Sequence, residues 1–560
     1  MHYTNQLSRD AKPFSYDVKR KDVTKYAPLG MAMHAIRGSG LLDGPIAVLD
    51  KYCPRPVPLF VYNNRAIVEQ LIAAGITGHW NFQDASALAH DPVFTQSISG
   101  PSVASAPTVC RVFGRIDACC QNQRNEALSE IGKSLEDLEA NKTAPERIAT
   151  ALTDAIGMSL LDNCLRILAK SPQPYIMIDV DGTPVRLFGK QQERAYDGHY
   201  GFTDYLPILV TINGLPAFVQ NAPGAAYGAG LLDRIIDELL KRVRQAFPDK
   251  LVVVRGDTGY CNDALLSKIA AQSCRFIVGN NVQARRQEQA LLEQVRQNYA
   301  SIDGRKGIPE AVMQFFCPEP ECFELQAEQS ARSRAHAPAY KYRACGIVEG
   351  YRAKSWTVPR TVVYRLNYDP AFQNKNSGIN LRFIQTNLTA EELEVLSAGR
   401  GLEKGRATPE TSLESSREQA VYSIEMYESV FGDRGMDERL NCEWKSHCFA
   451  STCSCSGFFA NSVRMLLSTL LMQAMCWMRM KIFPEHTKRK PTAHRNSLKT
   501  NTSRAHKAEK RHAGPTLQSI RTNLFCVPAV VSISSMRVHL SIAQMSSFWT
   551  QALHRLARIT

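Results

Sequence analysis

The stretch Tyr175–Asp181, which reads YIMIDVD, decides the fold of this chain. It follows Pro172 and Pro174, where the pattern of apolar residues changes from helical to alternating. An alternating pattern predicts a strand, in which successive side chains point to opposite faces of a sheet. Asp179 and Asp181 stand at alternate positions, so both project from one face while their apolar neighbours pack the other. Acids that end an apolar strand are unusual, and they make this strand a candidate for carrying chemistry.

The residues after this strand predict a mixed α/β layer. Three antiparallel strands come first, and the turn Asn213-Gly214 joins the second to the third. Helix and strand patterns then alternate, which is typical of a sheet covered by helices. The predicted elements are strands at 175–181, 205–213 and 215–221, a helix at 230–247, a strand at 251–255, a helix at 263–271 and a strand at 276–278.

The residues before Pro172 predict an N-terminal helical region. From 57 to 156 the pattern is mostly helical, and 105–111 has the composition of a capped helix start. A short helix, a turn and a helix carrying Arg111 and Arg115 would form a helix-turn-helix that contacts DNA. An exposed basic face on an ordinary helical bundle explains the same residues equally well.

Three further segments differ in composition from the predicted core. Residues 282–424 hold scattered strand candidates and predict a β-rich insertion, after which helix returns. Residues 481–513 hold ten Lys and Arg against two acids, which favours a flexible basic linker that holds phosphate; a merely solvated linker is the alternative. The predicted domains are 1–172, mainly helical and DNA-binding; 173–281 with 425–480, the core; 282–424, the insertion; 481–513, the linker; and 514–560, a small C-terminal element.

The composition narrows the class of protein. The chain has 560 residues, with 67 Lys and Arg against 53 Asp and Glu and a formal net charge of +14 at pH 7. This excess makes a polyanion the first partner to consider. The N-terminus lacks the apolar core of a secretory signal, and the apolar run 458–480 is broken by Asn461 and Arg464. We therefore expect a cytoplasmic protein with no membrane partner.

The sixteen cysteines are expected to be reduced thiols, as is usual in a cytosolic chain of this size. The cluster His447, Cys448, Cys453 and Cys455 suggests a zinc site as the alternative. Its Cys-x4-Cys-x-Cys spacing differs from the paired Cys-x2-4-Cys units of structural zinc sites. The thiol interpretation is therefore preferred.

Two further acids join those of the first strand as candidates for a metal-dependent phosphodiester site. Such chemistry uses two divalent cations, and hard cations such as Mg²⁺ prefer carboxylate oxygens. Asp257 lies just past the buried strand 251–255, at the edge where ligands bind in open α/β sheets. Glu438 shares one predicted helical stripe with Arg434 and Lys445, which would hold phosphates. A turn aspartate that caps the next element and a salt-bridged surface helix are the plainer interpretations.

These motifs occur in a fixed order along the chain. Asp181–Thr183 is followed by Arg255–Tyr260 (RGDTGY), and then by the pattern Phe-x2-Arg-x3-Glu-x6-Lys at Phe431–Lys445. The ordered set resembles the DDE-class transposases of bacterial insertion sequences, most closely the insertion-sequence group numbered thirteen-eighty. Further matching segments extend the resemblance through most of the chain, at 91–94, 105–111, 189–191, 382–388 and 459–461.

The resemblance implies an RNase H-like core with two Asp on adjacent strands, a Glu on the last helix and a β-rich insertion before that helix. Carried over residue by residue, it makes Asp181, Asp257 and Glu438 the metal ligands, with Arg434 and Lys445 as phosphate contacts. The activity it implies is metal-dependent cleavage at the ends of an insertion sequence, followed by transfer of the freed 3′ hydroxyls into target DNA.

The match to the family leaves the identity of the first ligand open, and at one position this chain differs from the family pattern. Asp179 is the alternative first ligand, because the Asp-x-Asp pair with Asp181 leaves the register ambiguous by two residues. The family's Tyr is Phe431 here, so any hydrogen bond from that hydroxyl is missing. Either stacking by the ring suffices, or this copy is weakened.

The resemblance also implies the cofactors and partners. Two Mg²⁺ ions, with Mn²⁺ as a substitute, would be bound, and a homodimer would act on double-stranded DNA, both element ends and target, at the bacterial nucleoid. Two other classes stay open. A hydrolytic nuclease of the same fold would cleave without joining, and an inactive or repurposed DNA-binding protein would keep only sequence-specific binding.

Overall fold

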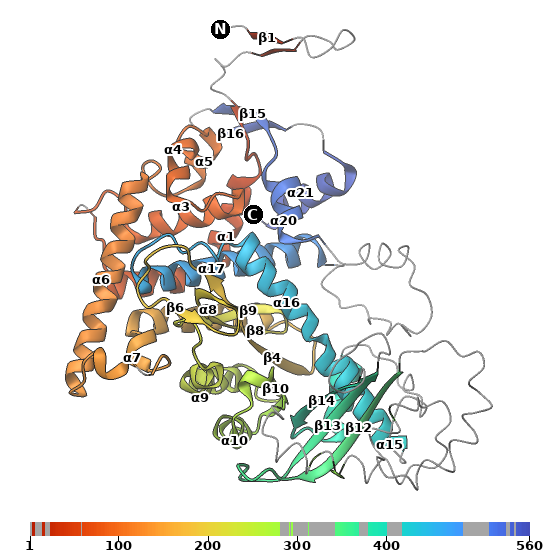
Figure 1. Cartoon of the computed structure of the whole chain (residues 1–560). Helices are drawn as coiled ribbons and strands as arrows, with labels where there is room; N and C mark the ends of the chain where they lie inside the picture. The colour runs from red at the N-terminus through yellow and green to blue at the C-terminus, as the bar shows by residue number, and fades with distance from the viewer. Residues whose placement is uncertain are drawn as a thin grey trace. The chain divides into compact units, whose positions relative to one another are not determined.

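The computed structural model divides the chain into two compact units (Figure 1). The first comprises residues 1–122, 443–485 and 514–560, and the second 123–442 and 486–513. The predicted linker lies outside the described residues except for its first four positions, as does much of the predicted insertion. The described residues are 3–5, 14–16, 23–57, 59–139, 141–280, 291, 293–294, 312, 342–368, 379–399, 417–484, 515–533, 538–542 and 545–559.

A mixed sheet with the order β12-β13-β14-β11-β10-β4-β8-β9 forms the centre of the second unit. β10 (Leu251–Gly256) lies parallel to β4 (Tyr175–Gly182) on one side and to β11 (Arg275–Gly279) on the other. β8 (Ile208–Ile212) pairs antiparallel with β4, and β9 (Leu215–Gln220) pairs antiparallel with β8. The predicted mixed α/β layer is confirmed in these five strands.

Three long antiparallel strands extend this sheet beyond β11. They are β12 (Tyr342–Tyr351), β13 (Arg360–Tyr368) and β14 (Ile379–Thr386), and β14 pairs antiparallel with β11. We predicted strands in this region as part of a separate insertion, whereas they continue the central sheet. The physical reason is that alternate side chains of all these strands enter one apolar core, which includes Tyr175, Met177, Val253, Ile277, Ile347, Val363 and Ile384.

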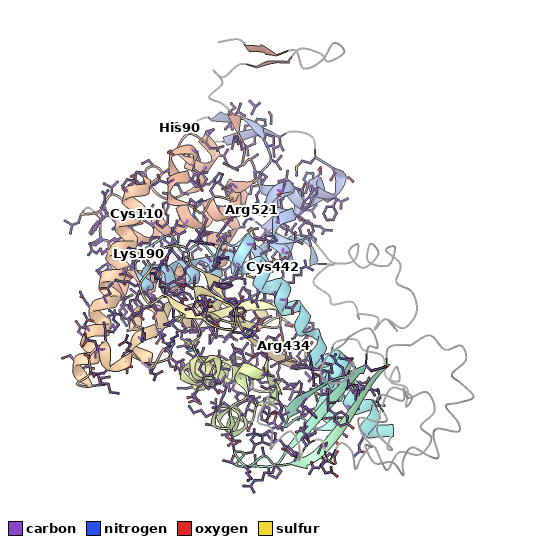
Figure 2. All side chains as sticks on the ribbon, viewed as in Figure 1. His90, Cys110, Lys190, Arg434, Cys442 and Arg521 are labelled. Atoms are coloured by element: carbon purple, nitrogen blue, oxygen red, sulfur yellow. The ribbon has the colours of Figure 1, made fainter. Side chains whose placement is uncertain are left out.

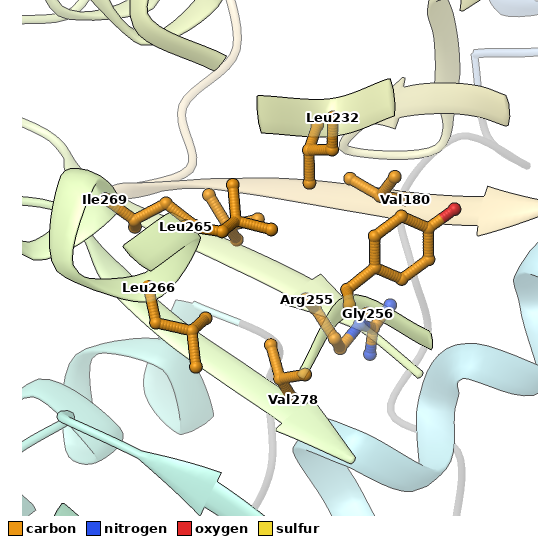
Figure 3. Close-up of a pocket in the computed structure, with 10 residues that line it drawn as sticks. Val180, Leu232, Arg255, Gly256, Leu265, Leu266, Ile269 and Val278 are labelled. Carbon is orange, nitrogen blue, oxygen red and sulfur yellow. The ribbon is translucent and has the colours of Figure 1, made fainter. Parts of the chain in front are cut away.

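Helices cover both faces of the sheet (Figure 1). α9 (Gly228–Ala246) and α10 (Asp263–Ala271) pack on one face, and α8 (Ala151–Leu168) packs against β9. α14 (Ala390–Gly399) and α15 (Arg417–Ile424) belong to the other face, together with the helical turn that follows α15. The space drawn in Figure 3, between α9, α10 and the strands, is lined mainly by apolar side chains, with Arg255 and Tyr260 among them, and has no room for a water molecule. It is packed core and not a binding cavity.

A small antiparallel sheet is inserted between β4 and β8. Its strands are β5 (Val185–Arg186), β6 (Ala195–Asp197) and β7 (Phe202–Tyr205), with β7 in the middle. The predicted strand at 205–213 is therefore divided, because β7 ends before Pro207 and β8 begins after it. Proline has no N–H to donate to a strand ladder, which explains the division.

The first unit is mainly helical, and α17 (Phe458–Ile482) is buried over most of its length. Every residue from Phe458 to Cys476 is buried, so this apolar run forms a helix of the core. None of the helices in the described ranges has the length and hydropathy that a membrane span requires. The other helices of this unit are α1 (Leu29–Ser39), α2 (Asp43–Tyr52), α3 (Asn64–Thr77), α4 (Ala85–Leu88), α5 (Pro92–Ser97), α20 (Leu517–Ile520) and α21 (Ser547–Ile559).

Two features of this unit were predicted from the sequence. β15 (Ala529–Ile533), β16 (Val538–Ile542) and α21 form the segment that was predicted as a small C-terminal element, and β15 also pairs with β3 (Val23–Thr24). α6 (Ala106–Glu130) begins where the capped helix start was predicted, and its residues after Asn122 belong to the second unit.

The packing of α8 on β9 predicts the effect of one substitution. A Cβ atom at Gly157 would lie 2.4 Å from Cε2 of the buried Phe218 ring. We expect Gly157→Ala to lower the free energy of unfolding by about 1–3 kcal/mol, because the ring or the helix must move. Gly114→Ala on α6 is the matched control, since nothing lies within 4 Å of that Cβ. Thermal unfolding checks this, and equal midpoints for the two variants would contradict the packing described.

Candidate active site

Asp181 lies at the end of β4 among charged and polar groups of a helical segment. Nη2 of Arg434 is 3.5 Å from its Oδ1, and the Asn441 amide donates a hydrogen bond to its Oδ2. Burial raises the pKa of Asp181 to about 6; Arg434 opposes this shift, while the negative charges of Asp257 and Glu438 reinforce it. The three carboxylates are therefore close enough for each charge to act on Asp181.

Asp257 reaches this edge because β10 is the parallel neighbour of β4. The register pairs Gly256 with Val180, and the next residue along each strand is an aspartate. The carboxylate of Asp257 also accepts a hydrogen bond of 2.8 Å from the Gly259 N–H and caps the short turn that follows. Asp257 therefore both caps this turn and lies at the sheet edge beside Asp181.

Glu438 comes from α16 (Gly435–Cys442), where its side chain is exposed. Asn441, the residue that contacts Asp181, lies three positions later, so the two side chains share one side of the helix. Within the described ranges, no three His, Cys, Asp or Glu side chains gather as closely as a metal ion requires. The charges of Asp257 and Glu438 thus act on Asp181, but the three carboxylates are not gathered closely enough to form a metal site.

The helical segment that carries these residues is not one regular helix. Phe431 ends a π-helical stretch (Glu425–Phe431), Arg434 ends a 3-10 turn (Gly432–Arg434), and Lys445 lies in a second π-helical stretch (Glu443–His447). The predicted single stripe is therefore wrong, because these helix types have different numbers of residues per turn. Figure 2 labels Arg434 on this segment, in the second unit, whereas Lys445 belongs to the first.

The Phe431 ring supports the guanidinium of Arg434. Cζ of Arg434 lies 5.6 Å from the ring centroid, within the range of a cation–π contact. The ring in turn meets Tyr427 edge to face, with 5.6 Å between centroids. Phe431 therefore positions Arg434 through its face, a role for which the hydroxyl of a tyrosine is not needed.

Asp179 and Arg255 form a buried ion pair beneath the site. Their side chains are 4% and 1% exposed, and Nε of Arg255 donates to Oδ1 of Asp179. Nη1 of the same guanidinium donates to the carbonyl of Val430. Asp179 is thus occupied in joining β4 to β10, while Arg255 also joins the sheet to the helical segment that leads to Arg434.

Sequence reasoning missed three residues that lie near the carboxylates. The Tyr260 hydroxyl is buried with no hydrogen-bond partner in the part of the chain that is described, and burial, with Asp181 and Asp257, holds its pKa well above the usual value. Tyr260 was already visible as the last residue of RGDTGY, and Asn441 was visible through its spacing from the helical acid. Tyr200 carried no signal in its local pattern, because a loop brings it to the site.

The other predicted residues lie in the first unit. Arg111 and Arg115 are exposed on α6, while Val109, Val112 and Ile116 of this helix are buried, as the pattern predicted. Arg111 donates to the Thr108 hydroxyl at 3.2 Å, and Cζ of Arg115 lies 4.9 Å from the Phe60 ring. DNA contact by this helix stays a prediction.

The cysteines of the first unit have the character of thiols. Burial raises the pKa of Cys453 to about 12, although Arg464 opposes the shift. Cys448 is fully buried. No metal-binding group of His, Cys, Asp and Glu occurs among the described side chains, so nothing supports the zinc alternative.

Comparison with known proteins identifies the family. The family described as Transposase DDE domain group 1 matches residues 52–501, which is more than half of the chain. The chain therefore belongs to the DDE transposase family. No curated protein matches it.

One solved structure is similar over much of its length. It is a cryo-EM structure of the piggyBac transposase synaptic complex with hairpin DNA, with 8% sequence identity, covering 86% of this chain and 78% of that one. The TM-score between the two structures is 0.28.

The raised pKa of Asp181 predicts how one variant responds to pH. Folding raises this pKa from 3.8 to about 6, so the proton on Asp181 stabilises the folded state below this interval and the stabilisation is lost as pH rises through it. Asp181→Asn has no carboxylate, so it lacks the negative charge that destabilises the folded wild type above this pKa. We expect it to exceed the wild type in free energy of unfolding by about 3 kcal/mol at pH 7.5 without metal, and by about half of that at pH 5.

Thermal unfolding in a chelating buffer measures this difference. Asp249→Asn, at an exposed position, is the control and should show no such dependence on pH. A constant difference between Asp181→Asn and wild type across this pH range would refute the electrostatic description of the site.

The buried ion pair predicts a second stability effect. Arg255→Met leaves the Asp179 carboxylate buried without its partner, which we expect to cost about 3–5 kcal/mol of unfolding free energy. The double variant Arg255→Met, Asp179→Asn should recover part of this loss, because it removes the charge on both sides. Urea unfolding of the three proteins is the measurement, and additive losses in the double variant would show that the two side chains do not interact.

Proposed function

We propose that this protein is a DNA transposase that cuts the ends of an insertion sequence in a metal-dependent reaction and joins the freed 3′ hydroxyls to target DNA. The observation that carries the proposal is the position of Asp181 at the end of β4, where burial raises its pKa to about 6 and the nearby charges of Asp257 and Glu438 add to the shift. Carboxylates that lie close enough to disfavour one another's ionisation are typical of a cation site.

The residues fit divalent cations chemically. Asp181, Asp257 and Glu438 would hold them, since carboxylate oxygens are the ligands that Mg²⁺ and Mn²⁺ prefer, and a bound cation would relieve the repulsion among these charges. The buried hydroxyl of Tyr260, which has no partner in the described chain, offers a polar contact beside them. When bound, two Mg²⁺ ions would activate the attacking oxygen and stabilise the leaving oxygen of the phosphodiester.

Asp181 is a better first ligand than Asp179. Asp179 is buried and accepts a hydrogen bond from Arg255, whereas Asp181 borders the sheet edge beside Arg434. Removing Asp179 from this pairing would leave a buried guanidinium without compensation. We therefore assign Asp181, Asp257 and Glu438 as the catalytic carboxylates.

Arg434 and Lys445 would each contact a DNA phosphate. Nη2 of Arg434 already lies 3.5 Å from Oδ1 of Asp181, and a guanidinium in this position can hold a phosphate beside the carboxylate. Because Phe431 supports this guanidinium through its ring face, the missing hydroxyl does not argue for an inactive copy.

The proposed fold and assembly follow from the same family. The order β9-β8-β4-β10-β11, with β4 in the middle and β10 and β11 parallel to it, favours an RNase H-like core. Arg111 and Arg115, both exposed on α6, would contact the element ends as part of an N-terminal DNA-binding region. The protein would act as a homodimer on double-stranded DNA in the bacterial cytoplasm, because two ends must be cut together.

A cleavage and joining assay tests the proposal. Purified protein is incubated with Mg²⁺ and DNA that carries its own element's ends, and nicked, excised and joined products are scored. We expect Asp257→Asn and Glu438→Gln to lower the rate of cleavage by at least about a thousandfold while DNA binding is kept, since they remove ligands of the cations. Asp249→Asn, at an exposed position of the same unit, is the control for a general effect of losing a carboxylate and should cut DNA as the wild type does.

The outcomes separate the three classes of function. Joined products that disappear with Asp257→Asn support a transposase, and cleavage without joined products supports a hydrolytic nuclease. Specific binding of the ends, with no cleavage by the wild type, would mean a DNA-binding protein and would overturn the proposed activity.

A further inference from the structure

A row of aromatic and basic side chains lies on the small sheet inserted after β4. The Arg186 guanidinium is 5.1 Å from the Phe188 ring centroid and 5.4 Å from that of Phe202. Phe202 stacks with Tyr200 at 5.9 Å and an interplanar angle of 24°, and Tyr200 meets His199 at 4.7 Å. These five side chains are called the ring row below.

The outer end of the ring row is strongly exposed. Phe188, at this end, is 85% exposed, whereas Tyr200, towards the inner end, is 40% exposed. A phenylalanine held in water by contact with one guanidinium leaves most of its apolar surface uncovered, and such surface on a folded protein often marks an interaction site. The ring row is therefore suited to a ligand whose flat faces can stack on its aromatic rings.

The inner end of the ring row lies beside the carboxylates of the active site. The Tyr200 phenol has its pKa raised by burial, and then by the charges of Asp181, Asp197 and Asp257. The small sheet begins directly after β4, so its position is set by the strand that carries Asp181. A ligand on the ring row would thus continue into the catalytic site.

The charges around the ring row favour a nucleic acid. Arg186 and Lys190 are exposed on this segment, and Figure 2 labels Lys190. Three acids of this segment are withdrawn from its surface: Glu193 pairs with Arg147 at 2.6 Å, Asp197 accepts backbone N–H groups of the following turn, and Asp204 is buried on β7. Bases stack on aromatic rings while arginine and lysine hold the phosphates, which is how single strands are bound without sequence preference.

We infer that the ring row binds unpaired nucleotides of the element end next to the scissile phosphate, with Phe188 and Tyr200 stacking on bases and Arg186 contacting the backbone. This inference rests on the proposed function. Paired DNA does not fit, since its base faces are covered by neighbouring bases, whereas strands that separate at a cut expose them. Because the ring row begins beside the carboxylates, the nucleotides that it binds would be those next to the cut.

Fluorescence measurements in Ca²⁺ buffer test this inference on the whole protein. One probe is a duplex of the element end, and a second carries four additional unpaired nucleotides with 2-aminopurine among them. Binding is followed by anisotropy, and stacking by the 2-aminopurine emission. We expect Phe188→Ala and Tyr200→Ala each to weaken binding of the second probe by about tenfold, the factor that ~1.4 kcal/mol of stacking produces, while binding of the plain duplex stays unchanged.

The small sheet provides a matched control. Tyr196 is 64% exposed on the same sheet, but it neighbours Asp197, the partner of Phe202 in the register, and so projects from the opposite face. Tyr196→Ala should bind both probes as the wild type does, and Phe188→Trp should keep the preference for the second probe.

The outcomes distinguish this inference from the proposed function. Equal affinity of the wild type for the two probes, or an equal loss with Tyr196→Ala, would overturn the role of the ring row and leave the transposase proposal standing. Failure of the wild type to bind either probe would instead count against the proposed function.

Discussion

The buried ion pair between Arg255 and Asp179 is the interaction on which the second unit depends. The two residues face each other in the parallel register of β10 and β4, and the same guanidinium donates to the carbonyl of Val430. Such a pair contributes little net stability after desolvation, but a slip of register would leave two charges buried and unpaired. It therefore specifies which residues of the two strands meet, and it fixes the helical segment four residues before Arg434.

The carboxylates above this pair show the opposite use of charge. Asp179 is compensated and buried, whereas Asp181, two residues later on the same face, lies near two further negative groups with Arg434 as the opposing cation. One strand thus carries a carboxylate that specifies the register and another whose ionisation destabilises the fold. The difference follows from how deeply each carboxylate is buried. Asp179 lies where water is excluded and its charge is neutralised by Arg255, whereas Asp181 lies where the sheet ends and a ligand can enter, and its charge is only partly neutralised.

Local pattern predicted the parts of the fold that depend on local chemistry. The strands β4, β10 and β11, and the aspartates at the ends of the first two, follow from alternation and from the rule that parallel strands end at one edge. The continuation of the sheet into β14 was missed, because its pairing with β11 joins residues about a hundred positions apart. The pairing of Asp179 with Arg255 was missed for a related reason: each residue's face was predictable, but its neighbour in space was not. The π-helical stretches were missed because each spans only about one turn, too short for the spacing of side chains to differ clearly from that of an α-helix.

These π-helical stretches restrict how the chain can change its length. Each residue of an α-helix turns the following side chains by about 100°, so a single deletion between Val430, which Arg255 holds, and Glu438 would rotate Glu438 away from Asp181 even if the helix re-formed. A substitution there alters one contact, whereas an insertion or deletion shifts every residue beyond it. Relatives that keep the same activity should therefore vary freely in the loops between strands, yet conserve the count of residues from Val430 to Asn441 without a gap.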